Sequence, residues 1–350
     1  MKIAVTYSTK EGLLKEFEKH NGSKFTVKDI PPDFFAEGDS PETIKAVIEA
    51  IRSAGHNVVG LEADESIESL FENFQPDLVF NMAEGLFGDF RESFVPMICE
   101  RMSIPYTGSD PLTLGICLNK AKAKEILSYY LIPNAAFKVF YPNQEIYIES
   151  FDFPGIVKPV SEGSSKGIFN DSVVDSISLA KKKIREKMLK YRQAIILEKF
   201  LTGEEFTVAV WGNGDDVEVL PIVAIRYVNL PEGARPIYSY EAKWIWDTPD
   251  KPLEIFQCPA QISTIQKDRI EEVAKDAYSV LNIRDWCRID IRFDENDIPH
   301  VIELNPLPGI LPKPEDNSCF PKAARTAGYS YEGMINNVVE IATKRHGLST

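Results

Sequence analysis

The feature that most constrains the fold is the pattern of the first hundred residues, in which short apolar runs alternate with helix-length segments. Three of these runs are apolar enough to form buried strands: residues 3–5, 57–61 and 77–81. Between the first two runs, Ser40 and Pro41 provide an N-cap and a first-turn proline for an amphipathic helix that Gly55 ends. Strands separated in this way pair in parallel, and parallel sheets bind ligands at the carboxyl ends of their strands. We therefore expect an N-terminal α/β domain whose functional groups follow the run at 77–81.

Beyond about residue 120 this pattern changes, because strand-like runs follow one another with shorter connections. These runs lie at residues 137–140, 155–158, 194–198, 205–211, 217–228, 286–293 and 299–304. Runs of this kind favour antiparallel sheets. We predict a parallel βαβ domain at residues 1–117, followed by a two-lobed α+β part with antiparallel sheets. The two lobes are predicted at residues 118–202 and 203–350.

The composition excludes several classes of function. The 350 residues contain 39 Lys+Arg and 53 Asp+Glu, a net charge of −14. Because Lys and Arg dominate binding to nucleic acids and anionic membranes, we expect neither partner. No apolar run approaches the ~20 residues that span a bilayer, and the first residues lack the apolar core of a signal peptide. The five cysteines form no C-x-x-C pair, which favours reduced thiols and a cytoplasmic protein.

The first segment with chemical content begins where an apolar strand ends at Lys158. A loop of small residues follows at 161–167, with glycines at positions 163 and 167. Backbone N–H groups and hydroxyls of such a loop can contact a polyphosphate, while Lys158 supplies a point charge. The segment does not match the P-loop pattern. Taken alone, a loop of this kind is more often an ordinary surface turn.

A second segment joins an acidic strand end to an apolar connector. Glu198 ends the strand, and residues 199–205 follow it. Backbone groups of the connector can bind the edge of an adenine, and a carboxylate can accept hydrogen bonds from ribose hydroxyls. Without further context, we favour a surface hairpin with solvated acids for this segment.

The third segment combines two successive strands with polar residues at alternate positions. Arg288 and Asp290 share one face of the first strand, and Glu303 and Asn305 repeat the spacing on the second. Three oxygen ligands without a thiol or imidazole match Mg²⁺, which binds through a few carboxylates and nucleotide phosphates. Arg288 can neutralise phosphate charge on the same face. Solvated hairpin carboxylates would not explain the apolar residues between them, so we favour a functional surface.

Taken in order, these segments resemble the ATP-grasp superfamily, and within it the D-alanine–D-alanine ligases and related carboxylate–amine ligases. Residues 104–109 followed by Lys120 are similar to the end of that family's first domain and its first ATP-contacting lysine. Residues 238–243 resemble its mobile loop, and residues 321–328 complete the pattern. The resemblance covers most of the chain and implies an ATP-grasp fold for the two lobes.

The resemblance also implies a role for each matching position. Catalytic roles fall on Arg288, Ser164 and Lys243, and metal binding falls on Asp290, Glu303 and Asn305. ATP binding falls on Lys120, Lys158, Glu162, Gly163, Ser164, Ser165, Glu198, Lys199, Phe200, Leu201 and Glu205. Substrate binding falls on Glu84, Arg91, Tyr240, Gly309 and Ser318.

The implied reaction has two steps. ATP phosphorylates a carboxylate to give an acyl phosphate and ADP, and an amine then displaces the phosphate to form an amide or peptide bond. The implied cofactors are ATP and two Mg²⁺ ions, with Mn²⁺ as an alternative metal. The implied partners are small amino acid or peptide substrates. The chain could also form a homodimer. Lys158 and Arg288 would hold the negative charge that otherwise repels the attacking carboxylate.

The substrate positions depart from the family's pattern. The D-alanine ligases carry a His-Glu-Val-Ser-type motif near the start of the chain, whose Glu holds the first amino group, and residues 7–12 contain no such motif. Their His-Gly pair after the third strand is replaced here by a pair that begins with Glu84, and Ser318 matches their carboxylate-binding serine only across a gap. We expect a substrate other than the standard D-alanine pair, with Glu84 or Glu11 holding its amino group and Ser318 or Arg91 its carboxylate.

Two other functions are compatible with an ATP-binding chain of this kind. The chain could bind ATP as a regulatory ligand without ligase activity, or it could transfer phosphate without using an amine. The complete set of Asp290, Glu303 and Asn305 favours the ligase. ADP release measured with and without candidate amines distinguishes the three.

Overall fold

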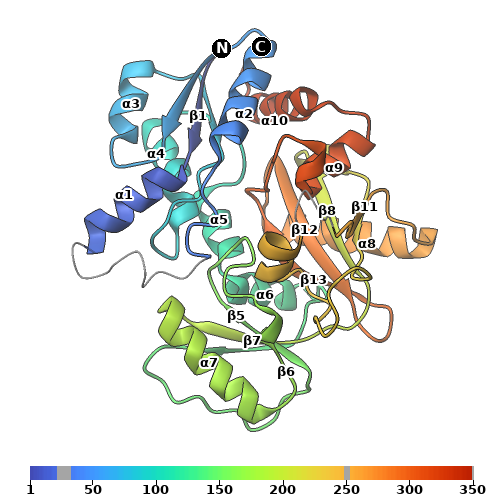
Figure 1. Ribbon diagram of the computed structural model, residues 1–350. Coiled ribbons are helices and arrows are strands. Elements are labelled where there is room, and N and C mark those ends of the chain that lie inside the picture. Colours follow the sequence, from blue (N-terminus) through green and yellow to red (C-terminus); the bar gives the residue numbers. More distant parts are fainter. Residues whose placement is uncertain (22–32, 248–252, 349–350) are drawn as a thin grey trace.

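Three β-sheets organise the part of the chain that the computed structural model describes, residues 1–21, 33–247 and 253–348 (Figure 1). The first sheet contains β1–β3, the second β4–β7 and the third β8–β13. Each sheet falls within one of the three segments expected from the sequence. The domain boundaries at residues 117 and 202 themselves stay a prediction.

The first sheet is parallel, as the spacing of its strands predicts. Its order is β2-β1-β3, with bounds β1 (Lys2–Tyr7), β2 (Asn57–Glu62) and β3 (Leu78–Asn81). The helices of this region are α1 (Lys10–Asn21), α2 (Pro41–Ser53), α3 (Ile67–Phe74), α4 (Phe94–Met102) and α5 (Pro111–Leu118). Ser40 caps α2 as expected, since its hydroxyl accepts the Thr43 N–H at 3.1 Å.

The second sheet is antiparallel and carries one long helix. Its order is β4-β7-β5-β6, with bounds β4 (Phe137–Phe140), β5 (Gly155–Pro159), β6 (Val173–Val174) and β7 (Ile195–Lys199). Helix α6 (Lys120–Tyr129) precedes the sheet, and α7 (Ile177–Tyr191) packs against β5 and β7. This unit lies at the bottom of Figure 1.

The third sheet is also antiparallel. Its strands are β8 (Glu205–Trp211), β9 (Glu218–Val219), β10 (Val223–Ile225), β11 (Phe256–Gln257), β12 (Trp286–Phe293) and β13 (Pro299–Asn305). The predicted strand at 217–228 is divided into β9 and β10, because Pro221 lies between them and cannot donate to the ladder. The remaining helices are α8 (Thr264–Val280), α9 (Cys319–Thr326) and α10 (Tyr331–Arg345). Short helical turns are η3 (Arg91–Ser93), η4 (Asn170–Ser172), η5 (Gly214–Asp216), η6 (Ala242–Trp246) and η7 (Pro314–Asp316).

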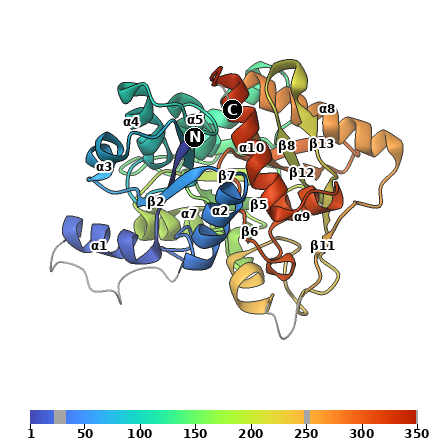
Figure 2. The same ribbon diagram turned by 90° about the horizontal axis from the view of Figure 1, so that it is seen from above.

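One apolar core joins the first and third sheets. Trp286 on β12 packs edge-to-face against Phe80 on β3 and Phe320 on α9, with ring centroids 5.7 and 5.4 Å apart. The same core includes residues of α2 and α10, which lie side by side in Figure 2. This packing holds the carboxyl end of the parallel sheet next to the polar face of β12.

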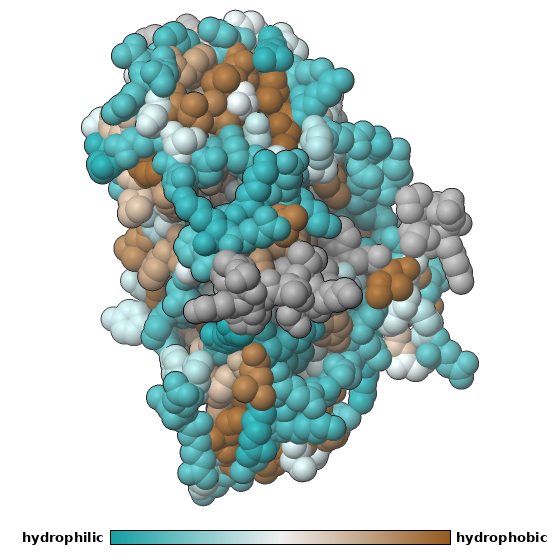
Figure 3. Space-filling view, turned by 60° about the vertical axis from the view of Figure 1, so that its left-hand side comes forward, coloured by the Kyte–Doolittle hydropathy of each residue, from teal (hydrophilic) through white to brown (hydrophobic). Residues whose placement is uncertain are grey.

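The face in Figure 3 is largely hydrophilic, with apolar side chains gathered in small groups between polar ones. None of the helices in the described ranges is long and apolar enough to cross a membrane.

The end of α10 is anchored by a buried carboxylate. The Nε and Nη2 of Arg345 each lie 2.8 Å from the carboxylate of Asp285, which is completely buried. Asp285 also accepts the Gly108 N–H at 2.7 Å, so this contact ties α10 to the segment that leads into α5. A buried charge of this kind is stable only while its partner is present.

Replacing Arg345 therefore tests how the last helix is held. We expect Arg345→Ala to lower the free energy of unfolding by about 3–5 kcal/mol, because Asp285 would remain buried and unpaired. Lys344→Ala is the matched control, since Lys344 pairs with Asp216 on the exposed surface. Urea unfolding followed by fluorescence measures both variants. Equal unfolding midpoints for the two variants would contradict this account.

Candidate functional site

A cavity of about 1310 Å³ lies where the three sheets meet. Its walls come from β5 and β7 of the second sheet, β8, β12 and β13 of the third, and residues 36–40 with Glu84 of the first region. A smaller hollow of about 80 Å³ shares Glu84, Lys243, Arg288 and Glu303 with it. The cavity thus opens at the carboxyl end of the parallel sheet, where the sequence analysis expects ligands.

Most of the expected site residues line this space. The cavity is lined by Glu84, Lys158, Ser164, Ser165, Glu198, Lys199, Phe200, Leu201, Glu205, Lys243, Arg288, Asp290, Glu303, Gly309 and Ser318. The smaller hollow adds Lys120, Glu162, Gly163 and Asn305. Residues up to 234 positions apart in the chain are therefore brought together, as Glu84 and Ser318 illustrate.

One end of the cavity has a buried ion pair beside an apolar wall. Lys158 Nζ lies 2.9 Å from the Glu198 carboxylate, and Lys124 Nζ lies 3.5 Å from it. Burial alone would raise the pKa of Glu198, but Lys124 and Lys158 outweigh burial and lower it. Ile156 and Phe200 lie at the same end of the wall. An aromatic ring could pack against this apolar wall, with the buried ion pair at the inner end of the cavity.

A second carboxylate at this end is held by an arginine that the sequence analysis did not identify. Arg292 lies 2.9 Å from Glu205 and 4.7 Å from the centre of the Phe200 ring. Burial raises the pKa of Glu205 although Arg292 opposes the shift. Arg292 continues the alternation of Arg288 and Asp290 along β12, and this spacing was the signal that could have found it.

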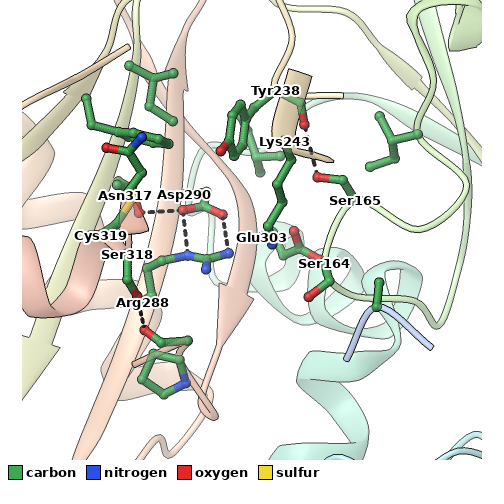
Figure 4. A pocket seen from close by; sticks show the side chains of 18 of the residues that line it. Ser164, Ser165, Tyr238, Lys243, Arg288, Asp290, Glu303, Asn317, Ser318 and Cys319 are labelled. Carbon is green, nitrogen blue, oxygen red and sulfur yellow. Dashed lines mark hydrogen bonds and ion pairs between the residues drawn. The ribbon is translucent and has the colours of Figure 1, made fainter. Parts of the chain in front are cut away.

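The polar face of β12 and β13 agrees with the expected hairpin. Asp290 is directly opposite Glu303 across the two strands, and Arg288 is opposite Asn305. Arg288 binds Asp290 through two nitrogens at 3.0 and 3.1 Å, which raises the pKa of Arg288 although desolvation opposes the shift (Figure 4). The Thr207 hydroxyl donates to Asp290 Oδ1 at 2.6 Å, the oxygen that also accepts from Arg288 Nε.

Glu303 on the same face is paired with the lysine that opens α6. Lys120 Nζ lies 2.6 Å from the Glu303 carboxylate. Burial would raise the pKa of Glu303, but Lys120 lowers it. Among the described residues, no group of three or more His, Cys, Asp or Glu side chains is arranged to hold a metal unaided. Two carboxylates and the Asn305 amide instead fit Mg²⁺, which completes its shell with water and nucleotide phosphates.

The loop at residues 161–167, called the phosphate loop from here on, turns its serines toward the cavity. Ser164 and Ser165 have backbone φ angles of +48° and +61°, and the Ser165 hydroxyl donates to the Tyr238 carbonyl at 3.0 Å. Lys243 on η6 extends between Arg288 and Ser164 (Figure 4). Desolvation and the nearby Arg288 lower the pKa of Lys243.

Glu162 of the phosphate loop serves to hold the loop in place. Its carboxylate lies 2.6 Å from Lys166 and accepts the Gln193 amide N–H at 2.7 Å, while its backbone carbonyl accepts from Lys120. The sequence analysis expected this side chain to bind nucleotide. The structure directs its carboxylate to neighbouring side chains at the edge of the smaller hollow, and its contact with a nucleotide stays a prediction.

The end of the cavity next to the parallel sheet is acidic. Glu84 follows β3 and forms no hydrogen bond or ion pair with any residue that the structure describes. Burial, then Glu37, Glu92 and Asp39, raise its pKa. Burial and Glu62 raise the pKa of Asp39 to about 7, although the Ser8 backbone N–H opposes the shift.

Ser318 lies at the start of α9 and faces the cavity. Its hydroxyl donates to the Gly309 carbonyl at 2.8 Å and accepts the Leu311 N–H at 3.3 Å. The serine is therefore fixed by the 309–311 turn and remains partly exposed in the cavity wall.

Three expected substrate residues lie elsewhere. Arg91 is buried against Glu37 and Glu162 and lines neither space, so it is not retained as a carboxylate-binding residue. Tyr240 packs on Phe169 outside the cavity wall, where Tyr238 lines the cavity instead. Glu11 is exposed on α1 and pairs with Lys15 at 2.8 Å. None of the three lines the cavity in this structure, since sequence order alone does not give side-chain direction, and a substrate role for Tyr240 or Glu11 stays a prediction.

Comparison with known proteins gives consistent results. The family model described as "D-ala D-ala ligase C-terminus" matches residues 129–340. A D-alanine–D-alanine ligase of Glaesserella parasuis is 34% identical over 306 residues, which cover 85% of this chain and 91% of that protein. An uncharacterized protein of Sinorhizobium fredii is 30% identical over 325 residues, covering 90% of this chain and 91% of that one.

A solved structure shows the same fold over nearly the whole chain. The D-alanine–D-alanine ligase of Bacillus anthracis complexed with ATP superposes with a TM-score of 0.70 at 21% identity. The superposition covers 99% of each chain.

The ion pair at the inner end of the cavity can be tested directly. We expect Lys158→Ala to weaken ATP binding by ten-fold or more, since a hydrogen bond to a charged group contributes roughly 1.5–3 kcal/mol. Isothermal titration calorimetry measures the affinity. Lys138→Ala, on the exposed side of β4, is the control and should leave the affinity unchanged. Equal affinities for both variants would show that Lys158 does not contact the nucleotide.

Proposed function

The chain belongs to the D-alanine–D-alanine ligase family of ATP-grasp enzymes, and from this premise we propose how its cavity carries out an ATP-dependent ligation. Members of this family join a carboxylate to an amine with ATP, so the chain is a carbon–nitrogen ligase. One observation supports the assignment of the site most strongly. Lys120, Lys158 and Arg288 each lie within 3.0 Å of a carboxylate at the meeting point of the three sheets.

The nucleotide occupies the end of the cavity between the second and third sheets. Phe200 and Leu201 would contact the adenine, and Glu205 would accept hydrogen bonds from the ribose. Lys158 and Lys120 would exchange their carboxylate partners for phosphate oxygens. The phosphate loop would then cover the phosphates through Ser164 and Ser165.

Asp290, Glu303 and Asn305 would hold Mg²⁺. The metal supplies positive charge at the phosphate oxygens and thereby lowers the repulsion toward an incoming carboxylate. The donor set fits this ion because all its ligands are oxygens on one face of the β12–β13 pair. The family resemblance further implies that two metal ions bind here and that Mn²⁺ can replace Mg²⁺, and both points are part of this proposal.

The chain's own cations would act on the reacting groups. The substrate carboxylate attacks the terminal phosphorus, and Arg288 and Lys243 would stabilise the charge that spreads over the transferring phosphoryl oxygens. The amine then attacks the acyl carbon, and phosphate leaves. Arg288 and the backbone near Gly309 line the cavity and would stabilise the oxyanion that forms at the acyl carbon.

The substrates would lie between Glu84 and Ser318. Glu84 lines the cavity, and the protonated amino group of a substrate would bind its carboxylate. Asp39 adds a second carboxylate at the same end. Ser318 would bind the carboxylate of the amine substrate. Because the acidic end of the cavity replaces the family's usual motif, we propose that D-alanine is a poor substrate. Formation of a homodimer stays a prediction.

Glu303→Gln tests the metal face. We expect the variant to bind ATP but to lose most of its Mg²⁺-dependent ADP production, because an amide is a weaker ligand for Mg²⁺ than a carboxylate. Glu295→Gln, on the exposed turn of the same hairpin, is the matched control. A coupled ADP assay with a mixture of amino acids measures both. Turnover like that of the unaltered protein would place the metal elsewhere.

Substrate choice is tested by amide synthesis. D-alanine alone should give little dipeptide, while another amino acid or small peptide should give a good rate. Glu84→Gln should raise the KM of the first substrate. The substrate's ammonium group opposes the raised pKa of Glu84 and favours its ionised form, and a neutral amide cannot pair with that group in the same way. Mass spectrometry of the products measures both. Efficient D-alanyl-D-alanine synthesis would contradict the proposal.

The acidic end also predicts a pH dependence. The groups that face Asp39 are Glu62, Glu84 and Tyr331. Since the pKa of Asp39 is about 7, its carboxylate is mostly protonated below that pH and ionised above it. Only the ionised form attracts an ammonium group, so the KM of the first substrate should fall between about pH 6 and pH 8. Asp39→Asn should flatten this profile, and an unchanged slope would exclude Asp39 from binding.

A further inference from the structure

Residues 33–39, called the latch segment from here on, reach from the N-terminal region onto the phosphate loop. The segment precedes α2, and its last residues lie beside the end of β1. The Asp39 N–H donates to the Ser8 carbonyl at 2.7 Å, and the Ser8 N–H donates to the Asp39 carboxylate at 2.9 Å. The latch segment is therefore fixed at the substrate end of the cavity.

Glu37 makes the central contact between the two segments. Its carboxylate accepts the Gly163 N–H at 2.8 Å and lies 2.9 Å from Lys166 Nζ. Arg91 lies 3.1 Å from the same carboxylate, and only 2% of the Glu37 side chain is exposed. Burial would raise the pKa of Glu37, but Arg91 and Lys166 outweigh burial and lower it to about 2. Glu37 is therefore ionised and pairs with two cations, one of them in the phosphate loop.

Asp33 makes a second contact at the other end of the phosphate loop. Its carboxylate accepts the Gly167 N–H at 2.7 Å and the Tyr191 hydroxyl at 2.8 Å. Asp33 is completely buried. Two carboxylates of the latch segment thus bind both glycines of the phosphate loop.

The contact explains why residue 163 is a glycine. A Cβ at this position would lie 2.7 Å from Glu37 Oε1, a distance that real side chains do not adopt. The backbone of Gly163 is not in a left-handed conformation, so conformational freedom does not require glycine here. The close approach of Glu37 does.

The latch segment also borders the proposed substrate end of the cavity. Ala36, Glu37 and Gly38 line the cavity together with Glu84, and Ser164 of the phosphate loop lines it as well. Glu37 therefore connects the proposed substrate end to the phosphate loop.

We propose that Glu37 is a positioning residue that holds the phosphate loop closed over the reacting phosphates only while the latch segment is seated at the substrate end. This inference rests on the proposed ligase function. Its consequence is that ATP consumption stays coupled to amide formation. When the latch is broken, water reaches the acyl phosphate and adds to the acyl carbon; the bond to the phosphate oxygen breaks, and a carboxylate, hydrogen phosphate and one proton are released.

Hydrogen exchange of the protein alone tests the latch without any substrate. We expect Glu37→Ala to speed exchange of the Gly163 amide by roughly ten-fold or more, the size expected for the loss of a bond to a charged group. Glu37→Gln should have a smaller effect, because its amide oxygen can still accept. Glu42→Ala, which removes an exposed partner of Lys313, is the control. Unchanged protection of residues 161–167 in Glu37→Ala would overturn the proposal.

Gly163→Ala provides a second test that does not remove Glu37. We expect this variant to expose the phosphate loop as Glu37→Ala does, because its new methyl group displaces the carboxylate. In the double variant the clash is gone, so Gly163→Ala should add nothing to Glu37→Ala. Additive effects of the two substitutions on exchange would overturn the proposal.

The ratio of ADP to amide measures the coupling itself. With ATP, Mg²⁺ and an equimolar mixture of D- and L-amino acids, the unaltered protein should form the two products in equal amounts. Glu37→Gln and Gly163→Ala should form ADP in excess. A ratio that stays at one while thermal stability falls would reduce Glu37 to a structural role. If the unaltered protein makes no amide, the proposed function fails, and the exchange experiment still decides whether Glu37 holds the loop.

Discussion

The pairing of buried cations with carboxylates is the interaction on which the cleft depends. An unpaired buried charge costs several kcal/mol, so each lysine or arginine that is proposed to bind phosphate needs a partner while phosphate is absent. Lys158 has Glu198, Lys120 has Glu303, and Arg288 has Asp290. Two of these partners are also the proposed metal ligands. A triphosphate with its metal would therefore offer new partners to both members of the Lys120–Glu303 and Arg288–Asp290 pairs, and to Lys158 of the third pair.

Much of this arrangement follows from periodicity in the sequence. The alternation along β12 and β13 predicts that Arg288, Asp290, Glu303 and Asn305 share one surface, and the register of the two strands confirms it. The parallel first sheet follows from strands separated by helix-length segments, and its carboxyl end opens on the cavity. These features can be predicted because the spacing of apolar residues within each strand or helix determines which of its faces is buried.

Contacts between distant segments could not be predicted in the same way. Glu37 binds Gly163 across 126 positions, and nothing in the latch segment marks it as a partner of the phosphate loop. Arg91 was expected at the substrate because it follows the third strand, yet it pairs with Glu37 and Glu162 on two other segments. In both cases the contact depends on where the side chain points after the three sheets have packed together. The pattern of residues within a single strand or helix does not predict that direction.

The central claim is that the cavity transfers the terminal phosphoryl group of ATP to a substrate carboxylate. Isotope transfer tests it most directly. An acid substrate labelled with ¹⁸O in its carboxylate is incubated with the protein, ATP, Mg²⁺ and an amine, and the released phosphate is analysed by mass spectrometry. The account predicts that one ¹⁸O atom appears in each phosphate, because the carboxylate oxygen leaves with it when the amine attacks. Phosphate without ¹⁸O would mean that ATP is hydrolysed by water, and would contradict the account.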